Sequence, residues 1–175
     1  MQLHFRISRG SGYDVACATA SKPMIYELID DMPVTESVDF SPPFAGHLYF
    51  VYLGEKQRSD TSIKSFLKEY NPTPEDIEYF SQITYKILNA KTLDQFCTLL
   101  HEHENRLSVI LKQPTLAESR FRNLNGTAKS LGAWGGDFAL IATAQPEEAL
   151  RQYLAKQHMN IIFPFKEIVY DGHKL

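Results

Sequence analysis

The amino-acid sequence predicts an α+β fold, in which strands are joined through helices that cover a sheet. Apolar and aromatic runs of strand length alternate with segments of helical periodicity, and a mostly helical stretch covers residues 61–124. Hydrophobic residues make up 43% of the 175-residue chain and charged residues 22%, which suffices for the core of one domain. This order of elements is typical of a ferredoxin-like sandwich, here with an added helical layer.

The first forty residues are predicted to form strands around one short helix. Polar and apolar residues alternate over residues 3–7, which indicates a strand. After a glycine-containing turn, the small residues of segment 13–21 suit a tightly packed, buried helix. Segments 24–29 and 38–40 are predicted as two further strands.

The middle of the chain carries the clearest strand and helix signals. Residues 47–53 are nearly continuous in apolar and aromatic types, which predicts a buried strand. A helix is expected over residues 61–70. Thr73 followed by a proline and two acidic residues predicts a helix start, and Thr92 with Gln95 three residues later predicts another through a capping box.

The last third is predicted to return to strands. Residues 116–124 are a shorter helical candidate, and Asn125 with Gly126 breaks the pattern. A strand is expected over residues 138–143, followed by a helix that opens at Pro146. Residues 160–170 are predicted to form one or two strands, interrupted at Pro164.

Composition excludes several classes of protein. The net charge of −3 gives no electrostatic footprint for nucleic acid. Cys17 and Cys97 are expected to be reduced, buried thiols, because they form neither a C-x-x-C pair nor a disulfide framework. No apolar run has the length of a signal-peptide core or a membrane span, so a cytoplasmic location is expected.

Asp14 is the first candidate for chemistry. It follows the turn at Ser11 and Gly12 and stands at the start of the predicted small-residue helix. A carboxylate in that position is well placed to face a ligand, and the helix N-terminus would keep it ionised. Helix capping by Asp14 is the alternative interpretation.

A glycine-rich segment over residues 132–136 is the second candidate. Its three glycines allow positive φ angles and a close backbone approach, and successive N–H groups in such a loop can bind an anion. A tight turn into the next strand is the alternative. Trp134 would either wall a pocket or fill a core.

Two further polar segments have weaker signals. Lys56, Arg58 and Ser59 follow the predicted strand 47–53 and would meet a phosphate or carboxylate, or else form solvated surface. Residues 101–105 hold two histidines and two glutamates. His101 and His103 point to different faces of a helix, so an exposed charged face is favoured over a metal site.

Two of these segments together resemble motifs of the GHMP kinase superfamily, which includes galactokinases, homoserine kinases, mevalonate kinases and phosphomevalonate kinases. Residues 10–16 are similar to the S-G-x-D segment that opens a helix in the mevalonate-pathway members. Residues 129–137 resemble the third motif, a K-x-[ST]-G-A-G-G-G loop. Leu131 stands where the family has Ser or Thr, and Trp134 replaces a glycine. Trp134 should narrow the loop and shape the acceptor pocket.

The resemblance implies roles for individual residues. Asp14 takes the place of the catalytic carboxylate, and Gly12 of the same motif takes a substrate- or phosphate-binding role. A binding role at the phosphate and substrate site falls to the third-motif residues Lys129, Gly132, Ala133, Trp134, Gly135 and Gly136. Lys56, Arg58 and Ser59 stand where mevalonate-type kinases have a short basic and hydroxyl segment. No metal-ligating residue is implied in this chain.

The motif that cradles the nucleotide triphosphate, P-x-x-x-G-L-G-S-S, is absent from these 175 residues. Residues 1–175 are therefore expected to form the C-terminal domain of such a kinase, with residues 1–22 as the end of its catalytic core region. The N-terminal ATP-binding domain would be missing. ATP and Mg2+ would act in the intact enzyme, and this chain alone would hold neither tightly.

The implied function is transfer of the γ-phosphoryl group of ATP to a hydroxyl or phosphate acceptor, with mevalonate or phosphomevalonate as the expected substrate. The chain alone is expected to be inactive without the other half in cis or in trans. The alternative is a non-catalytic ligand-binding or assembly module. A domain cut from a larger fold should expose an apolar face, so homodimer formation is expected.

Overall fold

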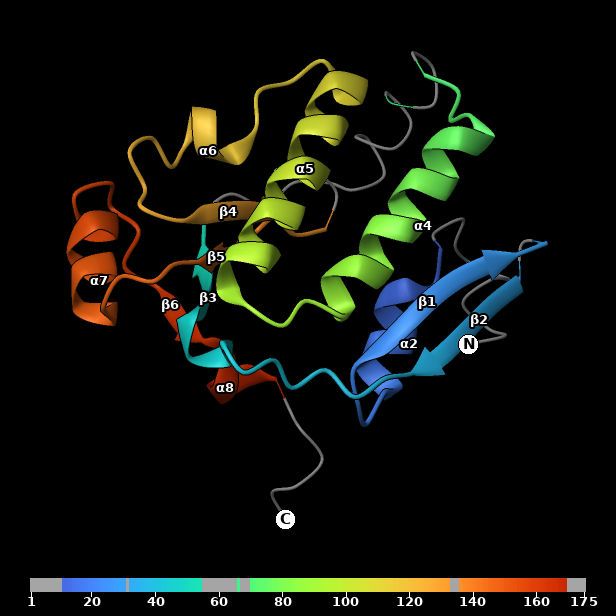
Figure 1. Ribbon diagram of the computed structural model, residues 1–175, viewed down its shortest axis with the longest axis horizontal. Coiled ribbons are helices and arrows are strands. Elements are labelled where there is room, and N and C mark those ends of the chain that lie inside the picture. Colours follow the sequence, from blue (N-terminus) through green and yellow to red (C-terminus); the bar gives the residue numbers. More distant parts are fainter. Residues whose placement is uncertain (1–10, 31, 55–65, 67–69, 133–135, 170–175) are drawn as a thin grey trace. The chain divides into compact units, whose positions relative to one another are not determined.

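The computed structural model describes residues 11–30, 32–54, 66, 70–132 and 136–169. Two compact units make up the chain: Met1–Ser41 together with Lys166–Leu175, and Pro42–Phe165. The mixture of helices with antiparallel sheets confirms the predicted α+β class. Figure 1 shows the elements of both units with their labels. Among the helices of the described residues, none is long and apolar enough to cross a membrane.

The first unit consists of helix α2 (Tyr13–Thr19) and an antiparallel hairpin of β1 (Met24–Ile29) and β2 (Met32–Ser37). The predicted strand 24–29 is confirmed, whereas the partner strand comes earlier than the predicted 38–40. Pro33 within β2 explains the error, because proline argues against a central strand. In a two-stranded sheet every strand is an edge, so proline is tolerated there.

Helix α2 forms where the small residues predicted it, but its burial differs from the expectation. Ala16 is the only residue of α2 that is buried, and Cys17 is exposed while Cys97 is half-buried. The expectation of a tightly packed helix with buried thiols was therefore wrong. Small size permits close packing but doesn't require it, so residue size alone is no measure of burial.

The second unit is built on a four-stranded antiparallel sheet in the order β4-β5-β3-β6. Its strands are β3 (Leu48–Tyr52), β4 (Thr127–Ser130), β5 (Phe138–Ala142) and β6 (Ile162–Pro164). The predicted strands 47–53 and 138–143 are the two central ones, β3 and β5. A short 3-10 helix, Ala45–His47, leads into β3.

Five helices follow one another along the rest of the chain: α4 (Pro74–Leu88), α5 (Leu93–Leu111), α6 (Leu116–Ser119), α7 (Glu147–Ala155) and α8 (Phe165–Ile168). Thr73 caps α4, which confirms the predicted helix start, and it does so in a reciprocal capping box with Asp76 that was not predicted. Thr92 accepts a hydrogen bond from the Gln95 backbone, but the Gln95 side chain bonds Lys91 instead of closing the box. Helix α5 packs on α4 and on β4 (Figure 1).

The main hydrophobic core lies on one face of this sheet. Val51 in β3 pairs with Ala139 in β5, and Tyr49 pairs with Ile141, so side chains two residues apart fill the same face. Helices α6 and α7 supply further core residues: Leu116 from α6, and Leu150 and Leu154 from α7. This packing holds β3 and β5 rigidly in the centre of the unit.

Three sequence-based boundaries are corrected by the structure. Strand β4 lies over residues 127–130, where only a loop was expected. The helical candidate 116–124 shortens to the single turn of α6. The strands expected over residues 160–170 reduce to β6 followed by the helical turn α8, because Pro164 ends the strand ladder. Most of the helix predicted over residues 61–70 lies outside the described residues.

Candidate functional site

Asp14 occupies the second helical position of α2. Gly12 is the N-cap residue, with φ of 79°, and the Ser11 hydroxyl oxygen accepts a hydrogen bond from the Tyr13 N–H at 3.3 Å. Asp14 is therefore not an N-cap, and its exposed carboxylate makes no hydrogen bond or ion pair with the other described residues. The geometry leaves this carboxylate open to solvent.

Two tyrosines fix the start of α2. The Tyr26 hydroxyl donates a hydrogen bond to the Ser11 carbonyl. The Tyr13 and Tyr26 rings meet edge to face with their centroids 5.6 Å apart. A hydrogen bond with Cys17, together with burial, raises the pKa of Tyr13 to about 12. Tyr13 thus stays protonated at neutral pH and contributes no charge beside Asp14.

The glycine-rich segment connects β4 to β5. The Leu131 N–H donates to the Phe138 carbonyl at 3.2 Å, and the Leu53 N–H donates to the Asp137 carbonyl at 2.8 Å. These two bonds tie both ends of the segment to the sheet. Ala133, Trp134 and Gly135 lie outside the described residues.

Gly132 and Gly136 are required for different physical reasons. Gly132 has φ of 72°, a conformation that other residues rarely adopt. A Cβ atom at Gly136 would lie 2.5 Å from the Leu131 carbonyl oxygen. The close approach at Gly136 is therefore to the chain's own backbone, and the segment is tightly closed at its base.

Lys129, which the resemblance assigns to phosphate binding, points away from solvent. Its Nζ lies 3.5 Å from Glu104 Oε1, 3.3 Å from the Ser130 carbonyl oxygen and 3.4 Å from His103 Nδ1. Only 19% of the side chain is exposed. A role for Lys129 in phosphate binding stays a prediction, since the amine is engaged here with groups of the chain itself.

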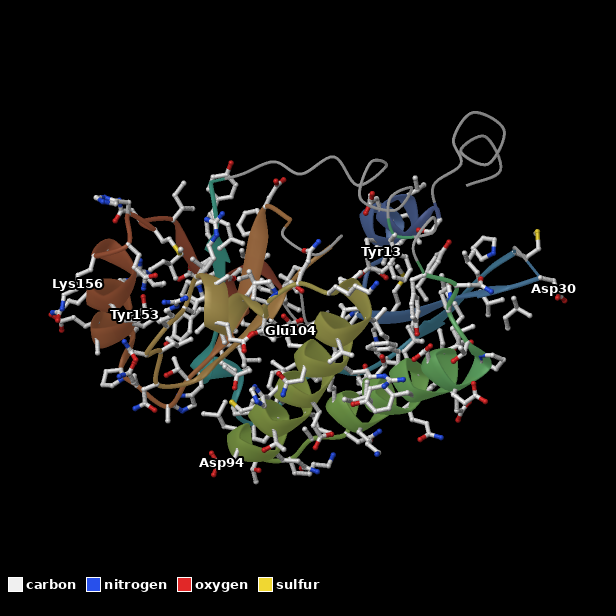
Figure 2. All side chains as sticks on the ribbon, turned by 90° about the horizontal axis from the view of Figure 1, so that it is seen from above. Tyr13, Asp30, Asp94, Glu104, Tyr153 and Lys156 are labelled. Carbon is white, nitrogen blue, oxygen red and sulfur yellow. The ribbon has the colours of Figure 1, made fainter. Side chains whose placement is uncertain are left out.

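Glu104 is the residue that sequence reasoning missed. It lies on α5 and is 2% exposed, and its Oε1 accepts a hydrogen bond from Ser130 Oγ at 3.0 Å. Figure 2 shows Glu104 inside the molecule, whereas Asp94 lies at the outer end of the same helix. The expectation of an exposed charged face over residues 101–105 was therefore wrong at Glu104.

A signal for this burial was present in the sequence. Glu104 is eight residues after Phe96 and four after Leu100, which places all three on the buried stripe of α5. Charged residues on such a stripe are buried only with a partner. The partners, Lys129 and Ser130, are more than twenty residues away along the chain, so local pattern gave no hint of them.

Burial governs the protonation of this cluster. It raises the pKa of Glu104, with the Lys129 charge opposing the shift, and it lowers the pKa of Lys129, with Glu104 opposing. Burial and the Lys129 charge lower the pKa of His103 to about 3, so this imidazole is neutral at pH 7. Glu104 Oε2 and Asp137 Oδ1 have no hydrogen-bond partner among the described residues.

The structure brings together Lys129, Ser130 and Glu104 at the start of the glycine-rich segment. Asp14 belongs to the first unit and this segment to the second. Lys56, Arg58 and Ser59 lie outside the described residues. Within the described part of the chain, no group of three or more His, Cys, Asp or Glu side chains is arranged to hold a metal ion.

The sequence matches no protein-family model and no curated protein sequence. The fold, in contrast, is similar to that of L. major mevalonate kinase, solved in complex with R-mevalonate. The identity is 17%, the TM-score is 0.69, and the match covers 89% of this chain and 52% of that one. A second solved mevalonate kinase matches at 18% identity and a TM-score of 0.52, over 79% of this chain and 45% of that one.

This similarity agrees at the level of the fold with the resemblance noted from residues 10–16 and 129–137. The chain spans about half of the length of the solved kinases that it matches. Its fold is thus that of about half of a mevalonate kinase chain.

Proposed function

We propose that this chain is the acceptor-side part of an ATP-dependent small-molecule kinase, which transfers the γ-phosphoryl group to a hydroxyl or phosphate acceptor. The observation that carries the proposal is the fold similarity to mevalonate kinase over 89% of this chain. The glycine-rich segment supports it, because the motif resemblance falls on a turn that requires glycine at residue 132.

The proposed division of roles follows from the residues present. Asp14, with its exposed carboxylate, would orient or deprotonate the acceptor group. Backbone N–H groups of residues 132–136 would bind anionic oxygens of the transferred phosphoryl group. The acceptor would be a small hydroxy acid such as mevalonate or phosphomevalonate, by analogy with the R-mevalonate bound to the L. major enzyme.

ATP and Mg2+ belong to this proposal as groups of the complete enzyme. Bound Mg2+ neutralises charge on the transferred phosphoryl group in kinases generally. The described residues offer no three-ligand cluster for the metal, so no step is assigned to it in this chain. The nucleotide-binding half is proposed to act in cis or in trans.

A phosphotransfer screen tests the proposal. Mevalonate, phosphomevalonate, homoserine and several sugars are offered with ATP to the 175-residue chain alone and to the chain supplied with a nucleotide-binding half. Negligible turnover is expected for the chain alone and turnover of one acceptor for the combination. Robust ATP turnover by the chain alone would contradict the proposed division, and failure of the combination with every acceptor would refute the kinase assignment.

Asp14→Asn provides the sharper test of the catalytic role. Asp94 is a matched control, since it is also an exposed aspartate at the second position of a helix. In the chain supplied with a nucleotide-binding half, we expect kcat to fall by about a hundredfold or more in Asp14→Asn, as for loss of a general base, and to stay unchanged in Asp94→Asn. Equal small effects in the two variants would remove Asp14 from the chemistry.

The second candidate function is an assembly module, and the β1–β2 hairpin favours it. Ile29, Met32 and Val34 lie on one face of the hairpin, with exposed fractions of 52%, 66% and 44%. Exposed apolar side chains gathered on one surface often mark an interface. Sedimentation at high concentration should then show a dimer that Met32→Lys disrupts, whereas a monodisperse monomer counts against this function.

A further inference from the structure

Glu104 and its partners form an unusual junction between α5 and β4. A carboxylate that is 2% exposed accepts hydrogen bonds from two consecutive strand residues, Lys129 and Ser130. Burying an ion pair costs desolvation of both groups, and a well-packed apolar pair in its place is often as stable or more so. A gain in stability alone therefore does not explain why Glu104 and Lys129 are buried as a pair.

The position of the junction in the sheet suggests another reason. Side chains of consecutive strand residues point to opposite faces, yet those of Lys129 and Ser130 both reach Glu104 Oε1. This is possible because β4 is an edge strand, so that a carboxylate beside its open edge can be reached from both faces. Lys129 Nζ also bonds the Ser130 carbonyl oxygen, which holds the backbone at the last residue of β4.

The glycine-rich segment leaves the sheet at that same point. Leu131 makes the last ladder bond to Phe138, and Gly132 then turns the chain with a positive φ. A glycine in this position has the widest conformational freedom of any residue, so its direction depends on what holds the preceding backbone. Among the described residues, the side-chain bonds at Ser130 come from Glu104 and Lys129.

We propose that Glu104 is a positioning residue: through Ser130 and Lys129 it fixes the end of β4 and thereby the direction of the backbone at Leu131 and Gly132, where the chain leaves the sheet. The effect on the backbone stands independently of any activity. Its consequence for ligand affinity rests on the proposed function, because only an anion-binding segment needs its N–H groups aimed in advance.

Two variants separate positioning from a contribution to stability. Glu104→Met removes the acceptor for Ser130 and leaves the Lys129 charge unpaired. The double variant Glu104→Met with Lys129→Met removes that charge as well, so its stability should recover toward that of the wild type. Positioning should not recover, since the Ser130 hydroxyl still lacks its acceptor.

Amide hydrogen exchange, read residue by residue by NMR, measures the positioning. In the double variant we expect the Leu131 amide to exchange about tenfold faster than in the wild type, while amides at the centre of β3 and β5 change little. Asp76→Asn is the matched control, because Asp76 also pairs with an arginine across two elements of this unit but does not touch β4. Glu104→Gln keeps a side-chain oxygen as acceptor and should preserve most of the Leu131 protection.

The outcomes are distinct. The proposal is overturned if the Leu131 amide regains wild-type protection when the double variant regains stability. It is also overturned if the exchange rate of Leu131 changes only as much as that of the other amides of the unit. In either case Glu104 is a stabilising residue. If the double variant does not fold, Ser130→Ala provides the same test, since it removes only the hydroxyl that donates a hydrogen bond to Glu104.

A titration with R-mevalonate, followed in the same spectra, tests the functional consequence separately. An affinity reduced about tenfold in Ser130→Ala, which leaves Lys129 in place, would support aiming of the segment. Absence of binding by the wild type would count against the proposed function, whereas the exchange of Leu131 would still decide the positioning role.

Discussion

Two buried carboxylates link α5 to neighbouring elements, and they differ in how fully their oxygens are hydrogen-bonded. Asp76 at the start of α4 accepts hydrogen bonds from the Tyr70 hydroxyl, from the Thr73 backbone and side chain, and from Arg106 on α5 at 2.6 Å. Glu104 uses one oxygen for both of its partners, and its other oxygen is unpaired among the described residues. The first group is saturated with donors, and the second is not.

This difference reverses the effect on protonation. The hydrogen bonds from Tyr70 and Thr73, with the Arg106 contact, hold the pKa of Asp76 far below its usual range. Burial raises the pKa of Glu104, because Lys129 and Ser130 compensate only in part. Both side chains have low solvent exposure. The number of hydrogen-bond donors therefore decides which carboxylate is stabilised in its ionised form.

The largest effect is expected from removing the partner of the less satisfied carboxylate. Lys129→Met leaves Glu104 buried without a counter-ion, so we expect the free energy of unfolding to fall by about 3 kcal/mol at pH 7. Lys86→Met, at an exposed lysine on α4, is the control and should change it by less than about 0.5 kcal/mol. Urea unfolding measures both, and equal effects would mean that the Glu104 pair carries no special cost.

The pH dependence of stability should differ in sign between the two carboxylates. Asp76 has a folded pKa below its unfolded value, so its contribution is present above the unfolded pKa and is lost as the pH falls. Glu104 has a folded pKa above its unfolded value, so its contribution is present below the unfolded pKa and is lost as the pH rises through the folded pKa.

Unfolding at a series of pH values, with Asp76→Asn and Glu104→Gln beside the wild type, measures these slopes. The advantage of the wild type over Asp76→Asn should shrink as the pH is lowered below about 4, the usual range of an aspartate pKa. Its advantage over Glu104→Gln should grow as the pH is lowered from 7. Slopes of the same sign would show that the environment of Glu104 is not governed by burial.

The same two residues show what the sequence can predict and what it cannot. Asp76 follows Thr73 by three residues, so its capping role is a local pattern, and the start of α4 was found correctly. Strands β3 and β5 were also predicted, because a continuous apolar run indicates a buried strand whichever strand it pairs with. Glu104 depends on β4, a strand of four residues that the local pattern did not reveal.

In the candidate site, too, the features set by local sequence were predicted and those set by distant partners were not. The glycine-rich segment was visible in the sequence because glycine has a distinct conformational meaning, and Gly132 indeed has a positive φ. The engagement of Lys129 was not visible, because side-chain partners far apart in the chain are set by strand order. A lysine in a motif is expected to face a ligand, and only the fold reveals that it pairs with a buried glutamate.

The smallest effect is expected at the hydroxyl that links the pair to the strand. Ser130→Ala removes one hydrogen bond to Glu104, which should lower the free energy of unfolding by about 1 kcal/mol. Thr98→Ala is a suitable control, since among the described residues its exposed hydroxyl donates to the Asp94 carbonyl within α5 and to no group outside this helix. Because Glu104 is left with Lys129 alone, its pKa should rise further, and the pH-dependent slope of Ser130→Ala should become steeper than that of the wild type. An unchanged slope would mean that Lys129 alone sets the charge of Glu104, and the number of donors would then not explain the contrast with the fully hydrogen-bonded Asp76.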